Sequence, residues 1–251
     1  MKQIVKDKLI VKSLESRAVM GAVAAETVSE KINELLKDKP FVNIIFAAAP
    51  SQNEFLENLV KKEVDWSRIN AFHMDEYLNL EASAPQGFGN FLRERLFDKV
   101  KFNSVHYLDG NAADPMDECL RYSDLLEEFP TDIVCMGIGE NTHLAFNDPH
   151  VADFNDPLLV KVVDLDLECR IQQVNDGCFE TLDEVPTHAL TLTIPTLLKA
   201  TYAFAMVPGE KKANAVYHTL TESISEHYPS TILRKQPNAI LFTDDQSSVL
   251  I

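Results

Sequence analysis

Two adjacent carboxylates and a histidine stand together in residues 72–77, which read FHMDEY directly after a hydrophobic run. A carboxylate that is partly desolvated beside another carboxylate has a raised pKa, which suits it to abstract a proton. Asp75 or Glu76 is therefore predicted to act as a general base. The alternative is that the pair only caps the next segment within a solvated loop.

A second histidine, His143, lies in a segment that runs from Gly137 to Pro149. The amide of Asn141 and the carboxylate of Asp148 are close to it in sequence. A carboxylate that orients an imidazole fixes its tautomer and holds its pKa near neutrality, so the pattern favours an acid–base role over a purely structural one. The two glycines of this segment are too few for a dinucleotide-binding fingerprint.

Anion binding is predicted at two further segments and at one arginine. Residues 208–212 (PGEKK) open a helical pattern, and a helix start that carries a lysine such as Lys212 suits a phosphate group, although solvated lysines are the alternative. Residues 47–52 (AAAPSQ) follow a buried strand, and backbone N–H groups from Ser51 and Gln52 onward could surround an anion. Arg170 is a candidate for a forked phosphate contact or, equally, a surface arginine.

Hydrophobic periodicity predicts the elements that carry these residues. Apolar side chains spaced by three and four indicate helices, and unbroken apolar runs indicate strands buried on both faces. Ser51 is expected to cap the helix that follows it. Strands are expected near residues 8–11, 41–49, 69–74, 104–108, 132–138, 159–163, 189–194, 201–207 and 239–243, and helices at 14–36, after Ser51, and at 88–100, 116–128 and 210–221.

Strands that alternate with helices imply right-handed crossovers and a mostly parallel sheet. The predicted fold is therefore α/β and doubly wound, with helices on both faces of the sheet. No linker divides the chain, so residues 1–251 are expected to form one domain. Ligand sites of such folds lie beyond the carboxyl ends of the strands, where all four segments above are placed.

Composition excludes several classes of function. The chain has 251 residues and a formal net charge of −16, which argues against nucleic acid and against anionic membranes as partners. No run of 18 apolar residues or secretory leader is recognised, and the four cysteines form no C-x-x-C pair. We expect reduced thiols and a cytoplasmic protein.

The motifs resemble those of the glucosamine-6-phosphate deaminase/isomerase family, which is related to the 6-phosphogluconolactonases. The similarity extends over nearly the whole chain. Tyr77 and the Phe146–Pro149 run favour the deaminase branch, since the lactonase branch carries D-E-R and D-G-H-T-A-S-L-F-P at the corresponding places. The most specific segments are FHMDEY at 72–77, HLAFNDP at 143–149, VPTHALT at 185–191 and GEKKA at 209–213.

The resemblance implies an aldose–ketose isomerisation of a hexosamine 6-phosphate with loss of ammonia, without metal or cofactor. Asp75 would remove the C2 proton of the ring-opened amino sugar, and His143 would open the pyranose. Asp148 would orient His143. The implied phosphate ligands are Ser51, Lys212 and an arginine at or near Arg170.

The chain also departs from the family pattern. Residues 47–52 replace the usual G-T-G-S-T-P loop, Asn141-Thr142-His143 replaces Asp-Gly-His, and Asp148 replaces a glutamate. The β-branched Thr142 argues against a left-handed backbone at that position. The substrate could then be glucosamine 6-phosphate or its galacto epimer.

The sequence is also compatible with other functions. His143 could activate water against a sugar lactone, or the replacements at Asn141 and Asp148 could mark a non-catalytic sugar-phosphate sensor. A metal hydrolase that uses His73, Asp75 and His143 is a weaker alternative, because their spacing matches no H-E-x-x-H pair. The assembly state, a homo-oligomer included, is not determined by the sequence.

Overall fold

A computed structural model describes residues 2–251, and its centre is an eight-stranded sheet that is parallel except at one edge. The predicted doubly wound α/β fold is confirmed. Only the outermost strand is antiparallel to its neighbour, and its side chains are all exposed, which is why hydrophobicity did not reveal it. In spatial order the strands are β1 (Lys2–Lys6), β2 (Leu9–Ser13), β11 (Ala239–Thr243), β10 (Tyr202–Val207), β7 (Ile133–Met136), β3 (Val42–Phe46), β4 (Ile69–His73) and β6 (Ser104–His106).

A second, smaller sheet accompanies the mostly parallel one, and the sequence did not predict it as separate. Its three strands, β5 (Asp75–Tyr77), β9 (His188–Leu192) and β8 (Val160–Asp164), pair antiparallel in that order. The predicted strands at 159–163 and 189–194 belong here. Parallel sheets require cover on both faces, whereas β8 is only partly buried along its length.

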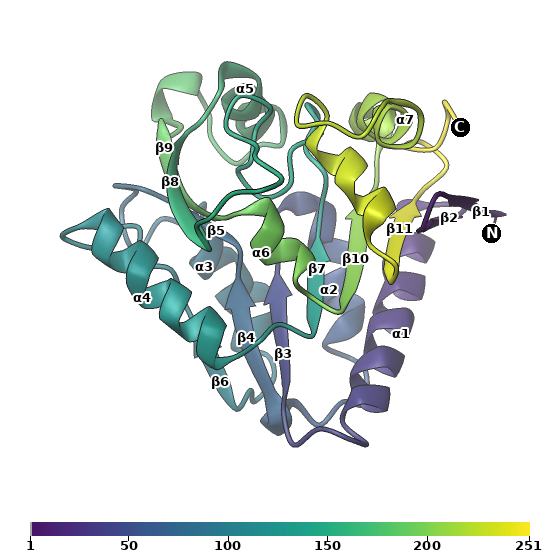
Figure 1. Cartoon of the computed structure of the whole chain (residues 1–251), viewed down its shortest axis with the longest axis horizontal. Helices are drawn as coiled ribbons and strands as arrows, with labels where there is room; N and C mark the ends of the chain where they lie inside the picture. The colour runs from purple at the N-terminus through teal and green to yellow at the C-terminus, as the bar shows by residue number, and fades with distance from the viewer. Residues whose placement is uncertain (1) are drawn as a thin grey trace.

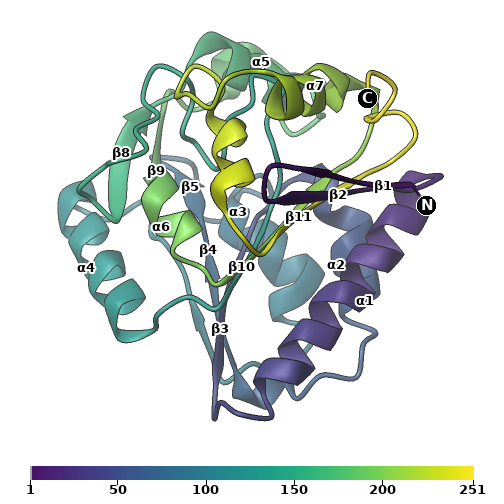
Figure 2. The same cartoon turned by 45° about the vertical axis from the view of Figure 1, so that its right-hand side comes forward.

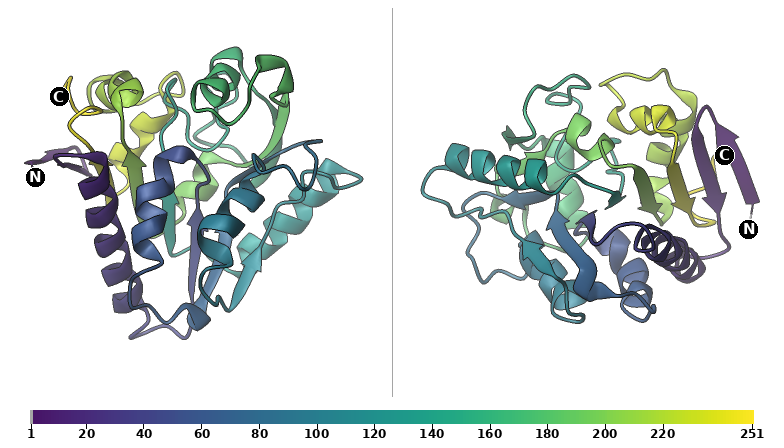
Figure 3. Two further views of the ribbon diagram at one scale, coloured as in Figure 1. Left: turned by 180° about the vertical axis from the view of Figure 1, so that it is seen from behind. Right: turned by 60° about the horizontal axis from the view of Figure 1, so that its bottom comes forward.

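Helices cover both faces of the large sheet. Figure 1 shows α4 and α6 in front of the sheet, and Figure 3 shows α1, α2 and α3 behind it. The chain termini lie at the same end, beside the β1–β2 hairpin (Figure 2). The helices are α1 (Arg17–Leu35), α2 (Asn53–Leu59), α3 (Phe88–Leu92), continued by a π-helical turn at Arg93–Phe97, α4 (Pro115–Glu128), α5 (Leu167–Asn175), α6 (Ile194–Leu198) and α7 (Ala213–Thr221). Short 3₁₀ turns lie at Pro50–Gln52, Trp66–Arg68, Leu182–Glu184, Glu210–Lys212 and Pro229–Lys235.

The first helix illustrates how sequence and packing agree. The Ser16 hydroxyl accepts a hydrogen bond from the backbone N–H of Val19 and so caps α1. The helix then packs closely on α2 through Gly21, where an added Cβ would come within 2.5 Å of the Glu54 Cβ. This contact fixes α2 and the Pro50–Gln52 turn that precedes it.

The parallel strands all end at one edge of the sheet, and the loops that leave them there form the candidate site. Loops after β3, β4, β7 and β10 meet at this edge, and the small sheet and α5 lie above it (Figure 1). Among residues 2–251, no helix is both long and apolar enough to cross a membrane.

Candidate active site

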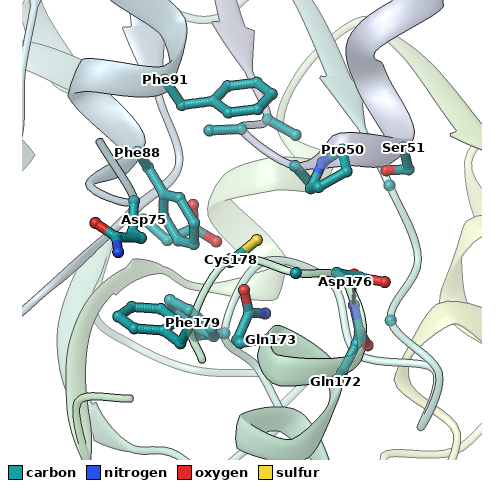
Figure 4. A pocket seen from close by; sticks show the side chains of 18 of the residues that line it. Pro50, Ser51, Asp75, Phe88, Phe91, Gln172, Gln173, Asp176, Cys178 and Phe179 are labelled. Atoms are coloured by element: carbon teal, nitrogen blue, oxygen red, sulfur yellow. Dashed lines mark hydrogen bonds between the residues drawn. The ribbon is translucent and has the colours of Figure 1, made fainter. Parts of the chain in front are cut away.

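A cavity of about 1160 Å³ opens at the carboxyl edge of the large sheet. Small-molecule sites usually occupy roughly 300–1,000 Å³, so a hexose phosphate would fit with room to spare. Of the predicted residues, Asp75, His143, Ser51 and Lys212 line this cavity. In the view of Figure 4, Asp75 lies at one end and Ser51 at the other, with Cys178 between them.

Asp75 presents its carboxylate to the cavity from β5. It is 7% exposed, and its side chain makes no hydrogen bond to any of residues 2–251. Burial, and secondarily the charge of Glu76, raise the pKa of Asp75 well above its ordinary value. A carboxylate with no protein partner and a raised pKa is a strong base when ionised, so its position suits proton abstraction.

Glu76 was the other candidate base, and the structure turns it away from the cavity. Successive side chains of a strand point to opposite faces, so Glu76 lies opposite Asp75 on β5. Its carboxylate accepts hydrogen bonds from the backbone N–H groups of Tyr77, Phe88 and Gly89, at 3.0, 3.0 and 2.8 Å. Glu76 therefore anchors the start of α3, as the capping alternative proposed.

His143 reaches the cavity from the loop after β7. Its Nδ1 lies 2.7 Å from the Asn141 Oδ1 and 3.0 Å from the Asp148 Oδ1. Both neighbours are acceptors, so Nδ1 carries the proton and Nε2 keeps a free lone pair. Nε2 makes no hydrogen bond to any of residues 2–251. The Gly139 backbone lies flat against the imidazole, where an added Cβ would come within 2.2 Å of Cε1.

Asn141 and Asp148 support His143 without lining the cavity themselves. The Asn141 amide donates to Asp148 at 3.0 Å and to Asp166 at 3.1 Å, which fixes the direction of its Oδ1 toward His143. Burial opposes ionisation of Asp148, but the hydrogen bond and charge of His143 and the Asn141 amide outweigh it and lower the Asp148 pKa. Despite its shorter side chain, Asp148 reaches the imidazole as a carboxylate.

Thr142 contradicts the expectation drawn from its side chain. It has a left-handed φ of 70°, although it is β-branched. The conformation is held by hydrogen bonds from Thr142 N to Gly139 O and from Ser230 N to Thr142 O, at 3.0 and 2.9 Å. A left-handed residue other than glycine costs roughly 1–2 kcal/mol, so the loop around His143 is strained.

His73 is a structural residue, which argues against the weaker alternative of a metal hydrolase centre. Its Nδ1 donates to the Asp75 carbonyl and its Nε2 accepts from the Leu108 N–H, both at 2.9 Å. Complete burial lowers the His73 pKa to about 4. Both nitrogens of a neutral ring are therefore occupied, and none remains for a metal.

Potential metal ligands do cluster behind His143. Its ring, Asp148 and the Cys169 thiol have donor atoms within 4.8 Å of one another among the described residues. The imidazole Nδ1 and the carboxylate are already joined by hydrogen bonds, and burial raises the pKa of Cys169 well above its ordinary value. The donor set is therefore explained by the support of His143, and we assign it no metal.

Ser51 and Gln52 were both predicted to bind phosphate, but only Ser51 lines the cavity. Ser51 lines the cavity, but its side chain does not cap α2; its Oγ accepts from the Gln52 amide at 3.0 Å. Gln52 is 1% exposed and also donates to the Met206 carbonyl. These two hydrogen bonds hold the Pro50–Gln52 turn in place, and Gln52 does not line the cavity. Its predicted role as a phosphate ligand is therefore corrected.

Of the two predicted cationic phosphate ligands, Lys212 lines the cavity and Arg170 does not. Lys212 is buried and lines the cavity, and desolvation lowers its pKa although the charge of Asp176 opposes this. The Arg170 guanidinium instead donates to the carbonyls of Leu182 and Val185, at 2.7 and 2.9 Å. It tethers the segment after α5 and does not line the cavity, so the predicted phosphate fork is wrong.

Several cavity residues were not found from the sequence. Gln172 and Gln173, two and three positions after Arg170 on α5, line the cavity, and Arg95 lines it from the π-helical turn after α3. No sequence motif marks these three residues. They are recognised as cavity residues only from the direction in which side chains leave α5 and from the way α3 packs. Four phenylalanines, Phe88, Phe91, Phe146 and Phe179, also line the cavity.

Comparisons with known proteins agree over nearly the whole chain. The model of a family described as glucosamine-6-phosphate isomerases/6-phosphogluconolactonase matches residues 15–242. The glucosamine-6-phosphate deaminases of Bacillus cereus strain B4264 and Bacillus thuringiensis strain Al Hakam are each 34% identical over 239 residues, which cover 95% of this chain and 87% of theirs.

Solved structures give the same picture. A monomeric glucosamine-6-phosphate deaminase superposes with a TM-score of 0.87 at 27% identity and covers 96% of this chain and 99% of its own. A 6-phosphogluconolactonase from Thermotoga maritima gives 0.78 at 21% identity and covers 94% of this chain and all of its own, which shows a shared fold.

Proposed function

The chain belongs to the glucosamine-6-phosphate isomerase/6-phosphogluconolactonase family, and on this premise we propose that it converts a hexosamine 6-phosphate into the ketohexose 6-phosphate and ammonia. Glucosamine 6-phosphate is the first candidate substrate and its galacto epimer the second. One water molecule is consumed: its oxygen becomes the ketone oxygen at C2, and the amine leaves as ammonia.

The first step is ring opening by His143. Because Asn141 and Asp148 hold the proton on Nδ1, the free Nε2 lone pair can take the proton of the C1 hydroxyl and return it to the ring oxygen. The C1–ring oxygen bond breaks and C1 becomes an aldehyde. Asp148 stabilises the imidazolium that forms between the two transfers, as a carboxylate does beside an acid–base histidine.

The second step is proton transfer by Asp75. The ionised carboxylate takes the proton from C2, and the electrons pass to the aldehyde oxygen, which takes a proton from the substrate's own ammonium group to give an enolamine. Asp75 then returns its proton to C1. The product is an imine at C2, which water hydrolyses to the ketone and ammonia. Burial raises the pKa of Asp75, which makes the carboxylate a better proton acceptor than one in water.

The phosphate end is assigned to Ser51 and Lys212. Both line the same cavity as Asp75 and His143, on loops that follow β3 and β10. A lysine that is desolvated offers its charge at low dielectric, where the attraction to a phosphate is stronger than in water. Convergence of the base, the histidine and the lysine on one cavity is the observation that carries this proposal.

The test is release of ammonia from glucosamine 6-phosphate, with the galacto epimer run in parallel. We expect Asp75→Asn to lower kcat by at least roughly 10²-fold while sugar-phosphate binding, measured by thermal shift, is kept. The matched control is Glu76→Gln, which changes the neighbouring carboxylate on the opposite face of β5 and should keep most of kcat. Near-wild-type turnover by Asp75→Asn would refute the assignment.

A lactonase is the second candidate, because the free His143 Nε2 could equally activate water against a sugar lactone. The two reactions separate in one experiment that follows ammonia release and hydrolysis of 6-phosphogluconolactone. Hydrolysis of the lactone alone would favour the second function. Stabilisation by ligands without any turnover would identify a sugar-phosphate sensor.

A further inference from the structure

We propose that Arg95 binds the phosphoryl group of the substrate together with Lys212, in the place that the sequence assigned to an arginine of α5. The inference rests on the proposed function, because it concerns the phosphate end of the same cavity. It adds a binding residue from another element of the fold, the π-helical turn Arg93–Phe97 after α3.

The cavity wall carries more acidic than basic side chains, so a phosphate group needs more than one cation there. Among the described residues that line it, Arg95 and Lys212 are the only arginine and lysine, against six carboxylates. Arg170 donates its hydrogen bonds to backbone carbonyls, and the α5 side chains that do line the cavity are the neutral amides of Gln172 and Gln173. A phosphate dianion entering a protein of net charge −16 needs concentrated local cations, so Lys212 alone is a poor match.

The guanidinium of Arg95 is held ready for a ligand. Its Nε donates to the Asn53 Oδ1 at 2.9 Å, and its Cζ lies 4.0 Å from the centroid of the Phe91 ring. A stacked and anchored guanidinium loses little freedom when it binds an anion. Within residues 2–251 its Nη2 makes no hydrogen bond, so one edge of the fork is free.

Its anchor places Arg95 beside the turn that carries Ser51. Asn53 begins α2, two residues after Ser51, so the arginine and the serine are tied to one segment. Arg95 and Cys178 line the same cavity. Burial and the charge of Asp176 raise the Cys178 pKa to about 11, and the positive charge of Arg95 opposes them.

The existing ion pair of Arg95 does not block this role. Nη1 donates to the Glu94 carboxylate at 2.9 Å, but the Glu94 side chain is 69% exposed. A pair between groups so open to water contributes little free energy and is easily exchanged. A phosphate inside the cavity can therefore compete with Glu94 for the guanidinium.

The experiment compares Arg95→Gln and Arg95→Lys with the matched control Arg93→Gln. Arg93 lies on the same turn and carries the same charge, but it stacks 4.8 Å from the Tyr107 ring centroid and lines a different cavity. For glucosamine 6-phosphate we expect Arg95→Gln to raise KM roughly 10- to 100-fold with a smaller change in kcat. Arg95→Lys should lie between Arg95→Gln and the wild type.

Binding is measured separately from turnover, so that failure of this inference and failure of the proposed function can be told apart. The probes are glucose 6-phosphate, glucose and inorganic phosphate in a thermal-shift titration. Arg95→Gln should lose most of the stabilisation by the two phosphates, whereas Arg93→Gln should keep it. Equal phosphate affinity in wild type and Arg95→Gln, or an equal loss in both variants, would overturn the role of Arg95 even if ammonia is released.

Discussion

The position of Asp75, which we propose as the base, carries an energetic cost to the fold. Its carboxylate is buried without a protein partner, so the ionised form is disfavoured in the folded state and its pKa is raised. Substrate-binding sites often keep such groups because reactivity and stability make opposite demands on them. The cost should therefore be measurable as a dependence of stability on pH.

We predict that Asp75→Asn is more stable than the wild type at neutral pH. Because the folded pKa is raised, the folded state holds the Asp75 proton over a range where the unfolded state has lost it. The stability contributed by that proton is present in full below the unfolded value, near 3.8, and is lost as the pH rises through the raised folded value.

The measurement is the difference in Tm between variant and wild type from pH 4 to pH 8. It should be small at the acidic end and grow in favour of Asp75→Asn as the pH rises. The exposed Asp124 provides the control, since Asp124→Asn should show no such growth. A difference that stays constant with pH would contradict the prediction.

Thr142 stores backbone strain next to His143. Its φ is 70°, its Oγ1 is buried without a hydrogen bond among the described residues, and the family pattern has glycine here. We predict that Thr142→Gly is more stable than Thr142→Ala by about 0.5–1 kcal/mol, because both remove the hydroxyl but only glycine relieves the left-handed strain. Urea unfolding measures the difference, and an alanine variant of equal or higher stability would argue against strain.

At the scale of elements, alternation along β5 separates two adjacent carboxylates. Asp75 and Glu76 are equivalent in the sequence, but pairing with β9 directs one into the cavity and the other onto the start of α3. The helical phase of α5 similarly directs Arg170 to carbonyls and Gln172 to the cavity. In both elements, the direction of a side chain decides its role.

The packing of α1 on α2 positions the Ser51 turn, and Gly21 permits it. An added Cβ at Gly21 would lie 2.5 Å from the Glu54 Cβ and 2.6 Å from its backbone carbon. We predict that Gly21→Ala lowers the free energy of unfolding by about 1–3 kcal/mol, despite the higher helix propensity of alanine.

The same change should raise KM for the phosphorylated substrate, because α2 and Ser51 move together. Chemical unfolding and steady-state kinetics check the two effects. A variant with wild-type stability and KM would show that the two helices adjust without displacing the turn.

At the scale of the whole molecule, the charge of −16 opposes an anionic substrate at long range. Salt screens this repulsion, since the Debye length falls from about 30 Å at 0.01 M to about 8 Å at 0.15 M, whereas contacts inside the cavity are screened less. We predict that kcat/KM for glucosamine 6-phosphate rises roughly fivefold between these ionic strengths. Any measurable turnover of cationic glucosamine should show the opposite trend, and a fall for the phosphorylated sugar would contradict this account.

Hydrophobic pattern along the chain was enough to predict the α/β class, most of the parallel strands and the edge of the sheet at which the candidate loops meet. Unbroken apolar runs mark buried strands, and parallel strands must end together, so the placement of Asp75, His143 and Lys212 on one cavity follows from local pattern and a topological rule. The roles assigned to these three residues remain predictions that the kinetic experiments test.

The sequence could not show which side chains of β5 and α5 face the cavity, because that depends on how these elements pack. Glu76 and Arg170 have suitable side chains, but backbone groups distant in sequence take up their hydrogen bonds. Asn53, 42 residues away, positions Arg95, and in the second sheet Asp75 of β5 pairs with Thr191 of β9, 116 residues away. Such contacts depend on long-range packing, which hydrophobic periodicity along the chain does not encode.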